Sequence, residues 1–381
     1  MLSIFILFAA AVLVMFSKGL GLALAIFGVA SITHPVSFEW LPGITFGWQV
    51  VPEWAPLMGV FVLITAIALF SARKFTRKQL ATFIIFVSGL LGFVGASHPL
   101  QFFFFMEMMI FPAFYLIFEQ DPAIAFKYFA YMQVAALLVL AGIFSSGTVS
   151  AVMFTLAFAI KMGLFPLGSW LPDAHSQAPH SLSTLLSSCT VVCGAYGLYR
   201  FSYHSLLLLV LAFMSIVYGA WRATRDEDLK RVLAFSTVSQ MGYAVLALIY
   251  APRILPTFLL MHSLAKATLF LSAGIIIDRT GIRRMEGLGV TSFSLMPACL
   301  VATLSLAGVP PLLGFWTDLA ILKAVTPLPL MLVALATMFF TLLYVERLMA
   351  IFFRREGRQK VEGWLPLLTA VLLVLGGILY E

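Results

Sequence analysis

The sequence predicts an all-α integral membrane protein with about fourteen transmembrane helices, two inverted five-helix repeats, and broken seventh and twelfth helices. Its 381 residues are 62% hydrophobic and 10% charged, whereas a soluble domain has about a quarter charged residues. Apolar stretches of about 20 residues recur along the whole chain, and each is long enough to cross the hydrocarbon core as a helix. Two segments rich in proline and glycine also resemble each other five spans apart.

The apolar stretches are expected to be helices, because a membrane barrel would show alternating strands of about 10 residues. The first stretch starts at Met1 without a basic flank, and no small-residue cleavage site follows it, so we expect a retained first span. The predicted spans are residues 1–17, 19–33, 55–72, 79–97, 99–118, 123–145, 149–179, 181–201, 203–221, 232–250, 254–277, 290–325, 327–353 and 364–380.

The seventh and twelfth spans are too long for plain helices and contain internal proline and glycine, so each is expected to break in mid-course. Residues 163–170 (GLFPLGSW) and 308–316 (GVPPLLGFW) share an apolar, Pro-Leu, Gly, Trp order. The two segments lie five spans apart. Because each span crosses the membrane once, an odd separation means that the two copies have opposite orientations in the membrane. The predicted division is an N-terminal three-helix segment 1–78, repeats 79–201 and 202–353, and a C-terminal helix 354–381. Chance similarity between the two segments is the alternative.

Basic residues gather in four short loops, at 73–78, 222–231, 279–284 and 354–360, whereas the loop 34–54 has no Lys or Arg. With fourteen spans, all four clusters fall on one side of the membrane. The positive-inside rule therefore predicts a multi-pass protein of a prokaryotic cell membrane with both termini outside. Orientation in the membrane also accounts for the net charge of +7, so nucleic-acid binding is not expected.

Cys189, Cys193 and Cys299 lie in apolar stretches, and the sequence shows no Cys-X-X-Cys or Cys/His ligand spacing. Iron–sulfur, zinc and haem sites have such spacings. We therefore expect no metal site and no cofactor in this chain.

Ionisable residues inside predicted spans indicate a function, because placing each charged side chain at the bilayer centre costs about 2.5–3.5 kcal/mol of insertion free energy. Glu107 lies in an apolar run of the fifth span, and Lys161 lies in the seventh span just before its break. A carboxylate and an ammonium at similar depth are expected to pair, each keeping the other charged. A purely structural ion pair is the alternative.

His262 and Lys266 are four residues apart in the eleventh span, so they share one helix face. Asp318 follows the second break, and Lys323 lies about one turn beyond it. In chain order, Glu107, Lys161, His262, Lys266 and Asp318 form an acid–base series that suits proton hopping through water. The residues expected to hold that water are Ser183, Ser187, Ser188, Thr190, Ser236, Thr237, Ser239 and Gln240.

Other polar residues have more than one interpretation. Lys127 could serve transport or extend its ammonium to the interface. Glu346 and Arg347 could form a local ion pair, contact a neighbouring subunit or act in transport. His175 and His180, expected in a loop, could line an entry route or cap helix ends. The phenylalanines at 102–105 are interpreted as a lipid or packing surface rather than a quinone site.

Four segments, in this order, resemble the proton-translocating antiporter-like subunits of respiratory complex I, Mrp-type cation/proton antiporters and membrane-bound hydrogenases. They are Lys161–Pro179 (KMGLFPLGSWLPDAHSQAP), Asp228–Tyr243 (DLKRVLAFSTVSQMGY), His262–Leu271 (HSLAKATLFL) and Ala307–Trp316 (AGVPPLLGFW). The likeness extends over most of residues 79–350.

The resemblance implies fourteen helices with both ends outside. It also implies that Glu107 and Lys161 are the fifth- and seventh-helix pair, that His262 and Lys266 are the eleventh-helix relay, and that Asp318 stands where relatives keep Lys or Glu. Two features depart from the family: residues 181–199 hold no Lys or His where relatives usually have one, and the chain lacks the long lateral helix of some members.

The predicted function is therefore translocation of protons or Na⁺ by a non-redox subunit of a dehydrogenase-like, hydrogenase-like, sulfur-reducing or Mrp-type complex. Redox centres are expected in partner subunits, and the partners are other membrane subunits, including further antiporter-like ones, within the lipid bilayer. A stand-alone cation/proton transporter and a structural subunit with a degenerate ion path are the alternatives, the second because of the missing eighth-helix base.

Overall fold

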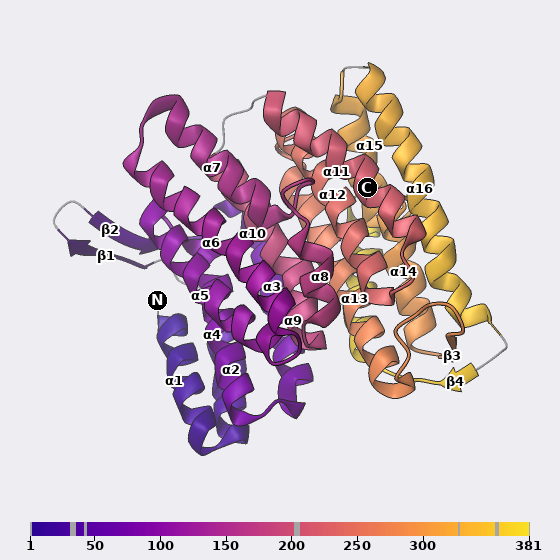
Figure 1. Cartoon of the computed structure of the whole chain (residues 1–381), viewed down its shortest axis with the longest axis horizontal. Coiled ribbons are helices and arrows are strands. Elements are labelled where there is room, and N and C mark those ends of the chain that lie inside the picture. Colours follow the sequence, from indigo (N-terminus) through magenta and orange to yellow (C-terminus); the bar gives the residue numbers. More distant parts are fainter. Residues whose placement is uncertain are drawn as a thin grey trace. The chain divides into compact units, whose positions relative to one another are not determined.

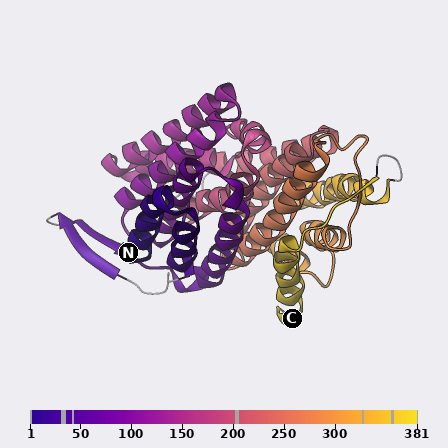
Figure 2. The same ribbon diagram turned by 90° about the horizontal axis from the view of Figure 1, so that it is seen from below.

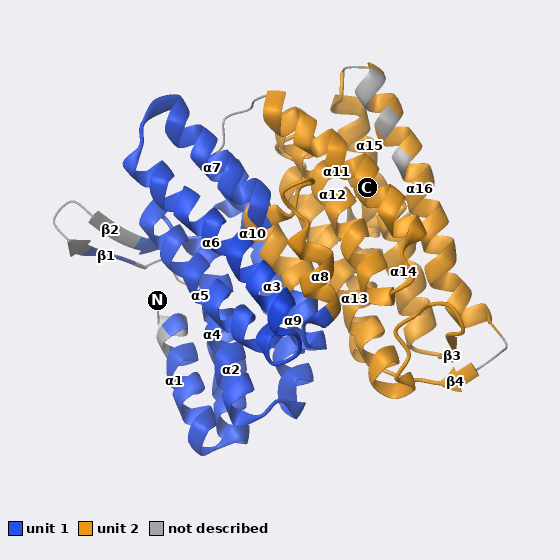
Figure 3. Cartoon of the chain, viewed as in Figure 1, with its two compact units in different colours: residues 1–161, 177–185, 196–203 blue, residues 162–176, 186–195, 204–381 orange. Residues whose placement is uncertain are grey.

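The computed structural model describes residues 2–30, 36–41, 44–201, 206–326, 328–354 and 358–380, which are mostly helical (Figure 1). The chain divides into two compact units (Figure 3). Unit 1 comprises residues 1–161, 177–185 and 196–203, and unit 2 comprises residues 162–176, 186–195 and 204–381. The four-part division predicted from the repeats stays a prediction.

Unit 1 is built from helices that follow one another closely, with α1 packed on α2 and α4, and with α4, α5 and α6 side by side (Figure 1). Thr76 and Gln79 form a reciprocal capping box at the start of α4, and Asp121 caps α6. The helices are α1 (Leu2–Phe16), α2 (Lys18–Ala30), η1 (Pro52–Trp54), α3 (Ala55–Ser71), η2 (Ala72–Lys74), α4 (Arg77–Gly95), α5 (Pro99–Phe118), α6 (Pro122–Phe144), α7 (Gly147–Met162) and α9 (His180–Leu185).

The all-α prediction is wrong for part of the loop 34–54, where β1 (Val36–Leu41) pairs antiparallel with β2 (Ile44–Trp48). The two runs are rich in β-branched and aromatic residues, which favour strands. The end of the hairpin is tied to helices of unit 1: Trp48 Nε1 donates to the Leu91 carbonyl at 3.3 Å, and Gln101 Oε1 accepts from Gly47 N at 3.3 Å.

Unit 2 is organised around α13, which packs against α12, α14 and α17. Figure 2 shows α17, which carries the C-terminus, beside the orange helices of the same unit. Its elements are α8 (Trp170–Gln177), the π-helical turn η3 (Leu186–Thr190), α10 (Val191–Phe201), α11 (Leu206–Arg225), α12 (Leu229–Tyr250), α13 (Leu255–Thr280), β3 (Gly289–Thr291), α14 (Leu295–Leu306), α15 (Leu313–Ala324), α16 (Leu328–Phe353), β4 (Arg358–Lys360) and α17 (Leu365–Leu379); α8 and α10 end in unit 1. β3 and β4 pair in parallel, a second strand pair that the all-α prediction missed.

The membrane character of the chain is confirmed. Among the described residues, nine helices are long and apolar enough to cross a bilayer, and five more apolar helices of 10–17 residues accompany them. The exact count of fourteen spans and the inverted relation of the repeats stay predictions.

Both predicted helix breaks are present. α7 ends at Met162 and α8 begins at Trp170, while α14 ends at Leu306 and α15 begins at Leu313. Each break opens with a glycine in the left-handed region, Gly163 at φ +79° and Gly308 at φ +66°, a conformation that disfavours other residues. Gly314, at the end of the second break, lies so close to the Ser305 carbonyl that a Cβ would collide with it.

Described residues from three of the four basic clusters lie at one end of unit 2. The Leu229 amide donates to the Arg283 carbonyl at 2.9 Å, and Arg354 Nη1 donates to the Met285 carbonyl at 2.7 Å. The loops after α11, α13 and α16 therefore meet. The placement of both termini outside stays a prediction.

Glu362, in the connection between α16 and α17, caps the start of α14. Its carboxylate accepts hydrogen bonds from Ser294 Oγ at 2.6 Å, from the amides of Phe293 and Ser294, and from Ser292 Oγ. A carboxylate at a helix N-terminus satisfies amides that have no partner within the helix. The hydroxyl of Ser294, followed by the Phe293 amide, lowers the pKa of Glu362 from 4.5 to about 2.

This cap gives stability a defined pH dependence. A carboxylate with a lowered pKa stabilises the folded state above its unfolded pKa and stops doing so as pH falls through its folded pKa. The difference in thermal unfolding midpoint between the wild type and Glu362→Gln in detergent should be constant above about pH 5 and vanish as pH approaches about 2. A difference that does not change with pH would contradict the assigned cap.

Candidate functional site

Lys161 lies in the last turn of α7, immediately before the first break, and its side chain is completely buried. Its ammonium stands 5.8 Å from the centre of the Phe93 ring of α4, an electrostatically favourable contact. The free carbonyls at the end of α7 also favour a cation in this position. The break thus places the end of α7, and the buried amino group of Lys161, inside the protein.

Glu107 lies on α5 of the same unit and is half-buried. Its Oε2 accepts a hydrogen bond from Gln133 Nε2 of α6 at 2.9 Å, and the carboxylate interacts electrostatically with Lys161. Gln133, which the sequence analysis did not single out, therefore orients the carboxylate. A direct ion pair between Glu107 and Lys161 stays a prediction.

Lys266 is completely buried in the middle of α13. Its Nζ donates to Ser236 Oγ at 2.5 Å and to the Leu233 carbonyl at 3.1 Å, both on α12. Ser236 Oγ and Thr237 Oγ1 donate to the same carbonyl, each at 2.9 Å. Both hydrogen-bond acceptors of the Lys266 amino group are therefore neutral oxygens, and neither is an acid.

His262 lies one turn before Lys266 on the same face of α13 and is also completely buried. Its imidazole interacts with Lys266 and with the backbone of Ser187. Ser187 belongs to the π-helical turn η3, and its hydroxyl shares a 2.8 Å hydrogen bond with Thr237 Oγ1. Sequence reasoning missed this turn. Such turns occur frequently at functional sites, and this one faces His262 from the segment that lacks the expected base.

Asp318 lies on α15 after the second break and is 6% exposed. A Cβ added to Gly308 would stand 2.9 Å from Asp318 Oδ2, so the glycine makes room for this carboxylate. Tyr344 of α16, which is 1% exposed, interacts electrostatically with Asp318 and through its hydroxyl with Ser236. Tyr344 was missed by sequence reasoning, although a tyrosine in an apolar helix could have marked it. Tyr344 therefore lies near both Asp318 and the Ser236–Lys266 pair within unit 2.

The remaining candidates take more limited roles. His175 is not in a loop but in α8, buried against Phe270 at 5.1 Å between ring centres, and His180 begins α9. Arg347 hydrogen-bonds to carbonyls at the end of α11, while Glu346 is exposed. Lys127 is half-buried on α6.

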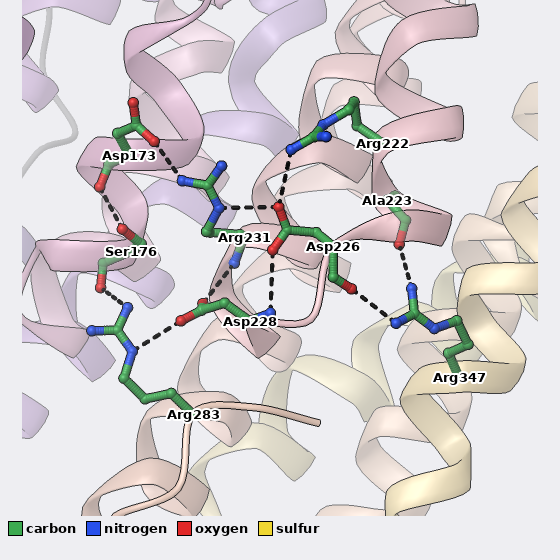
Figure 4. Close-up of polar contacts among 9 residues, drawn as sticks. All are labelled: Asp173, Ser176, Arg222, Ala223, Asp226, Asp228, Arg231, Arg283 and Arg347. Atoms are coloured by element: carbon green, nitrogen blue, oxygen red, sulfur yellow. Dashed lines mark hydrogen bonds and ion pairs between the residues drawn. The ribbon is translucent and has the colours of Figure 1, made fainter. Parts of the chain in front are cut away.

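Ion pairs hold α8 to the loops at one end of unit 2 (Figure 4). Arg231 of α12 binds Asp173 of α8 at 2.5 Å, and Arg283 binds both Asp228 at 3.0 Å and the Ser176 carbonyl at 2.6 Å. Asp228 also caps α12. These groups are partly exposed, where single ion pairs stabilise little. Their combined effect is to fix the segment that follows the first break.

Within the described residues, no group of three or more His, Cys, Asp or Glu side chains is placed to hold a metal ion. Cys189, Cys193 and Cys299 are buried free thiols. The chemistry that this arrangement offers is the binding and release of ions by buried acids and bases.

Comparisons with known proteins place the chain in a family. The family model "NADH:quinone oxidoreductase/Mrp antiporter, TM" matches residues 145–343. NAD(P)H-quinone oxidoreductase chain 4 2 of Thermosynechococcus vestitus is 30% identical over 338 residues, which cover 75% of this chain and 63% of that protein. The chain therefore spans less than two thirds of that relative's length.

Two solved structures share the fold. A chain of the archaeal membrane-bound sulfane sulfur reductase superposes with a TM-score of 0.86 at 22% identity, covering 100% of this chain and 93% of that one. A chain of respiratory complex I from Thermus thermophilus superposes with a TM-score of 0.85 at 24% identity, covering 100% of this chain and 95% of that one.

Proposed function

The chain belongs to the NADH:quinone oxidoreductase/Mrp antiporter membrane family, and from this premise we propose that it is an antiporter-like subunit that translocates protons or Na⁺. The observation that carries the proposal is the burial of ionisable groups inside apolar helices. Lys161, His262 and Lys266 are all completely buried. Centrally placed charges are expensive in a membrane protein and mark ion pathways.

The proposed path has a stage in each unit. In the first stage, Glu107 tunes the charge on Lys161. In the second stage, His262, Lys266 and Asp318 exchange protons through the hydroxyls of Ser236, Thr237 and Tyr344, which lie between or beside them. General acid–base groups act over hydrogen-bond distances, directly or through one water, and the Lys266–Ser236 contact is within that range.

The proposed partners are other membrane subunits, including further antiporter-like subunits, and the proposed redox centres lie in those partners. The relative named as a quinone oxidoreductase chain and the neighbour from a respiratory membrane complex support this assignment. The proposed location is a prokaryotic cell membrane. A structural subunit with a degenerate path is the second candidate, because residues 181–199 contain no Lys or His.

Replacing Glu107 and Lys161 distinguishes an ion-translocating subunit from a structural subunit with a degenerate path. In the assembled complex, Lys161→Met and Glu107→Gln should each lower ion translocation coupled to turnover by about tenfold or more, because proton transfer loses a positioned group. Assembly should persist, since methionine fills about the same volume as Lys161, and glutamine has the shape of Glu107 and can still accept the hydrogen bond from Gln133. Translocation is measured with a pH-sensitive dye in sealed vesicles.

The matched control is Lys78→Met, which removes an exposed lysine in the first turn of α4 from the same unit. It should leave translocation unchanged. Normal translocation in Lys161→Met and Glu107→Gln complexes would reject the transport proposal and support the structural role.

A further inference from the structure

A cavity of about 300 Å³ opens in unit 2 where α11 and α16 end. Three arginines line it: Arg225, the last residue of α11, Arg347 in the last two turns of α16, and Arg354, which follows α16. Ile351 contributes apolar surface. The ion path proposed above uses none of these residues.

The charge of the cavity favours an anion. Besides the three guanidinium groups, Glu227 and Glu286 line it. Arg284, which is not part of the lining, binds the carboxylate of Glu227. Arg284 therefore neutralises Glu227. The lining then has three positive charges and one remaining negative charge, that of Glu286.

Two of the arginines are held in place by backbone groups. Arg347 donates from Nη1 to the Thr224 carbonyl at 2.5 Å and from Nη2 to the Asp226 carbonyl at 2.9 Å (Figure 4 shows the second contact). Arg354 donates from Nη1 to the Met285 carbonyl at 2.7 Å. A guanidinium carries five N–H donors, so these contacts orient each group and leave further donors. Fixed guanidinium groups bind phosphate oxygens in defined geometry.

The position of the cavity at the ends of two candidate membrane spans indicates the source of the phosphate. α11 and α16 both contain candidate membrane spans, Leu206–Arg225 and Ala334–Phe353, and the cavity lies at their polar ends. Lipid phosphates occupy this level of a bilayer, and basic pockets between transmembrane helices bind anionic headgroups there. Ile351 and its neighbour Ala350, which also lines the cavity, offer apolar contact for the adjoining glycerol and chains.

We propose that this cavity binds the phosphate headgroup of an anionic phospholipid, such as phosphatidylglycerol, at the end of α11 and α16. The bound lipid would join α11 to α16 and to the loop that holds Met285. This site is independent of the ion path, so either proposal can fail without the other.

Native mass spectrometry of the delipidated protein in detergent tests this proposal, with phosphatidylglycerol, phosphatidylcholine and inorganic phosphate as separate probes. Phosphatidylglycerol should bind most tightly. Arg225→Gln and Arg354→Gln should each weaken its binding about fivefold, the factor for one basic residue at a membrane surface. Glu286→Gln should strengthen it, which keeps the test informative if an arginine variant folds poorly.

Arg279→Gln is the matched control, because Arg279 is an exposed arginine in the last turn of α13 that does not line the cavity. It should bind phosphatidylglycerol as the wild type does. Equal binding by all variants would overturn the site, and inorganic phosphate that competes fully with phosphatidylglycerol would show a free-anion site instead of a lipid site.

Discussion

Lys266→Met is expected to abolish ion translocation while leaving the protein folded and at least as stable as the wild type. The ammonium of Lys266 is completely buried, and Ser236 Oγ and the Leu233 carbonyl, both neutral, accept its hydrogen bonds. Methionine has a similar shape and no charge. Burying an amino group away from water has a desolvation cost that an apolar side chain does not have, so the substitution is not expected to destabilise the fold.

The groups that Lys266 leaves behind keep hydrogen-bond partners, which is why no large destabilisation is expected. Ser236 Oγ already donates to the Leu233 carbonyl at 2.9 Å, so neither group is orphaned by the substitution. Thermal unfolding in detergent measures the stability, and a pH-sensitive dye in vesicles measures translocation by the assembled complex.

Lys323→Met supplies the comparison, because Lys323 is an exposed lysine of α15 in the same unit. It should leave both quantities unchanged. A Lys266→Met protein that translocates normally would remove Lys266 from the path, and one that unfolds would show that the lysine serves the fold.

The sequence was sufficient to predict ionisable residues that lie within apolar helices. Lys161 and Lys266 stand out because an ammonium in an apolar helix needs a compensating reason, and both are buried in the structure. The helix breaks were predictable for a similar reason, since proline and glycine interrupt the helical hydrogen bonds at 163–170 and 308–316.

Features that depend on contacts between distant segments could not be predicted. Tyr344 reaches Ser236 from a helix about 100 residues away, and Glu362 caps α14 from beyond α16. Nothing in the local sequence fixes such partners. The π-helical turn at Leu186–Thr190 was missed because one extra residue in a helical turn hardly alters an apolar pattern. The hairpin β1–β2 was missed because its composition was interpreted only through its lack of basic residues.

Gly308→Ala is expected to destabilise the protein by about 2–4 kcal/mol, because two effects add. The backbone at Gly308 has φ +66°, and a new Cβ would stand 2.9 Å from Asp318 Oδ2. The backbone alone contributes about 1 kcal/mol, and the crowding of a packed site contributes about 1–3 kcal/mol. The free energy of unfolding in mixed detergent micelles measures the sum.

Gly281→Ala isolates the backbone contribution, because Gly281 has φ +70° and open space where its Cβ would stand. Its destabilisation should be about 1 kcal/mol. Asp318→Ala should reduce the effect of Gly308→Ala to this level in the double variant, since the crowded oxygen is gone. If Gly308→Ala costs no more than Gly281→Ala, the Asp318 carboxylate is free to move away from the second break. In that case the acid of the second stage is not held there.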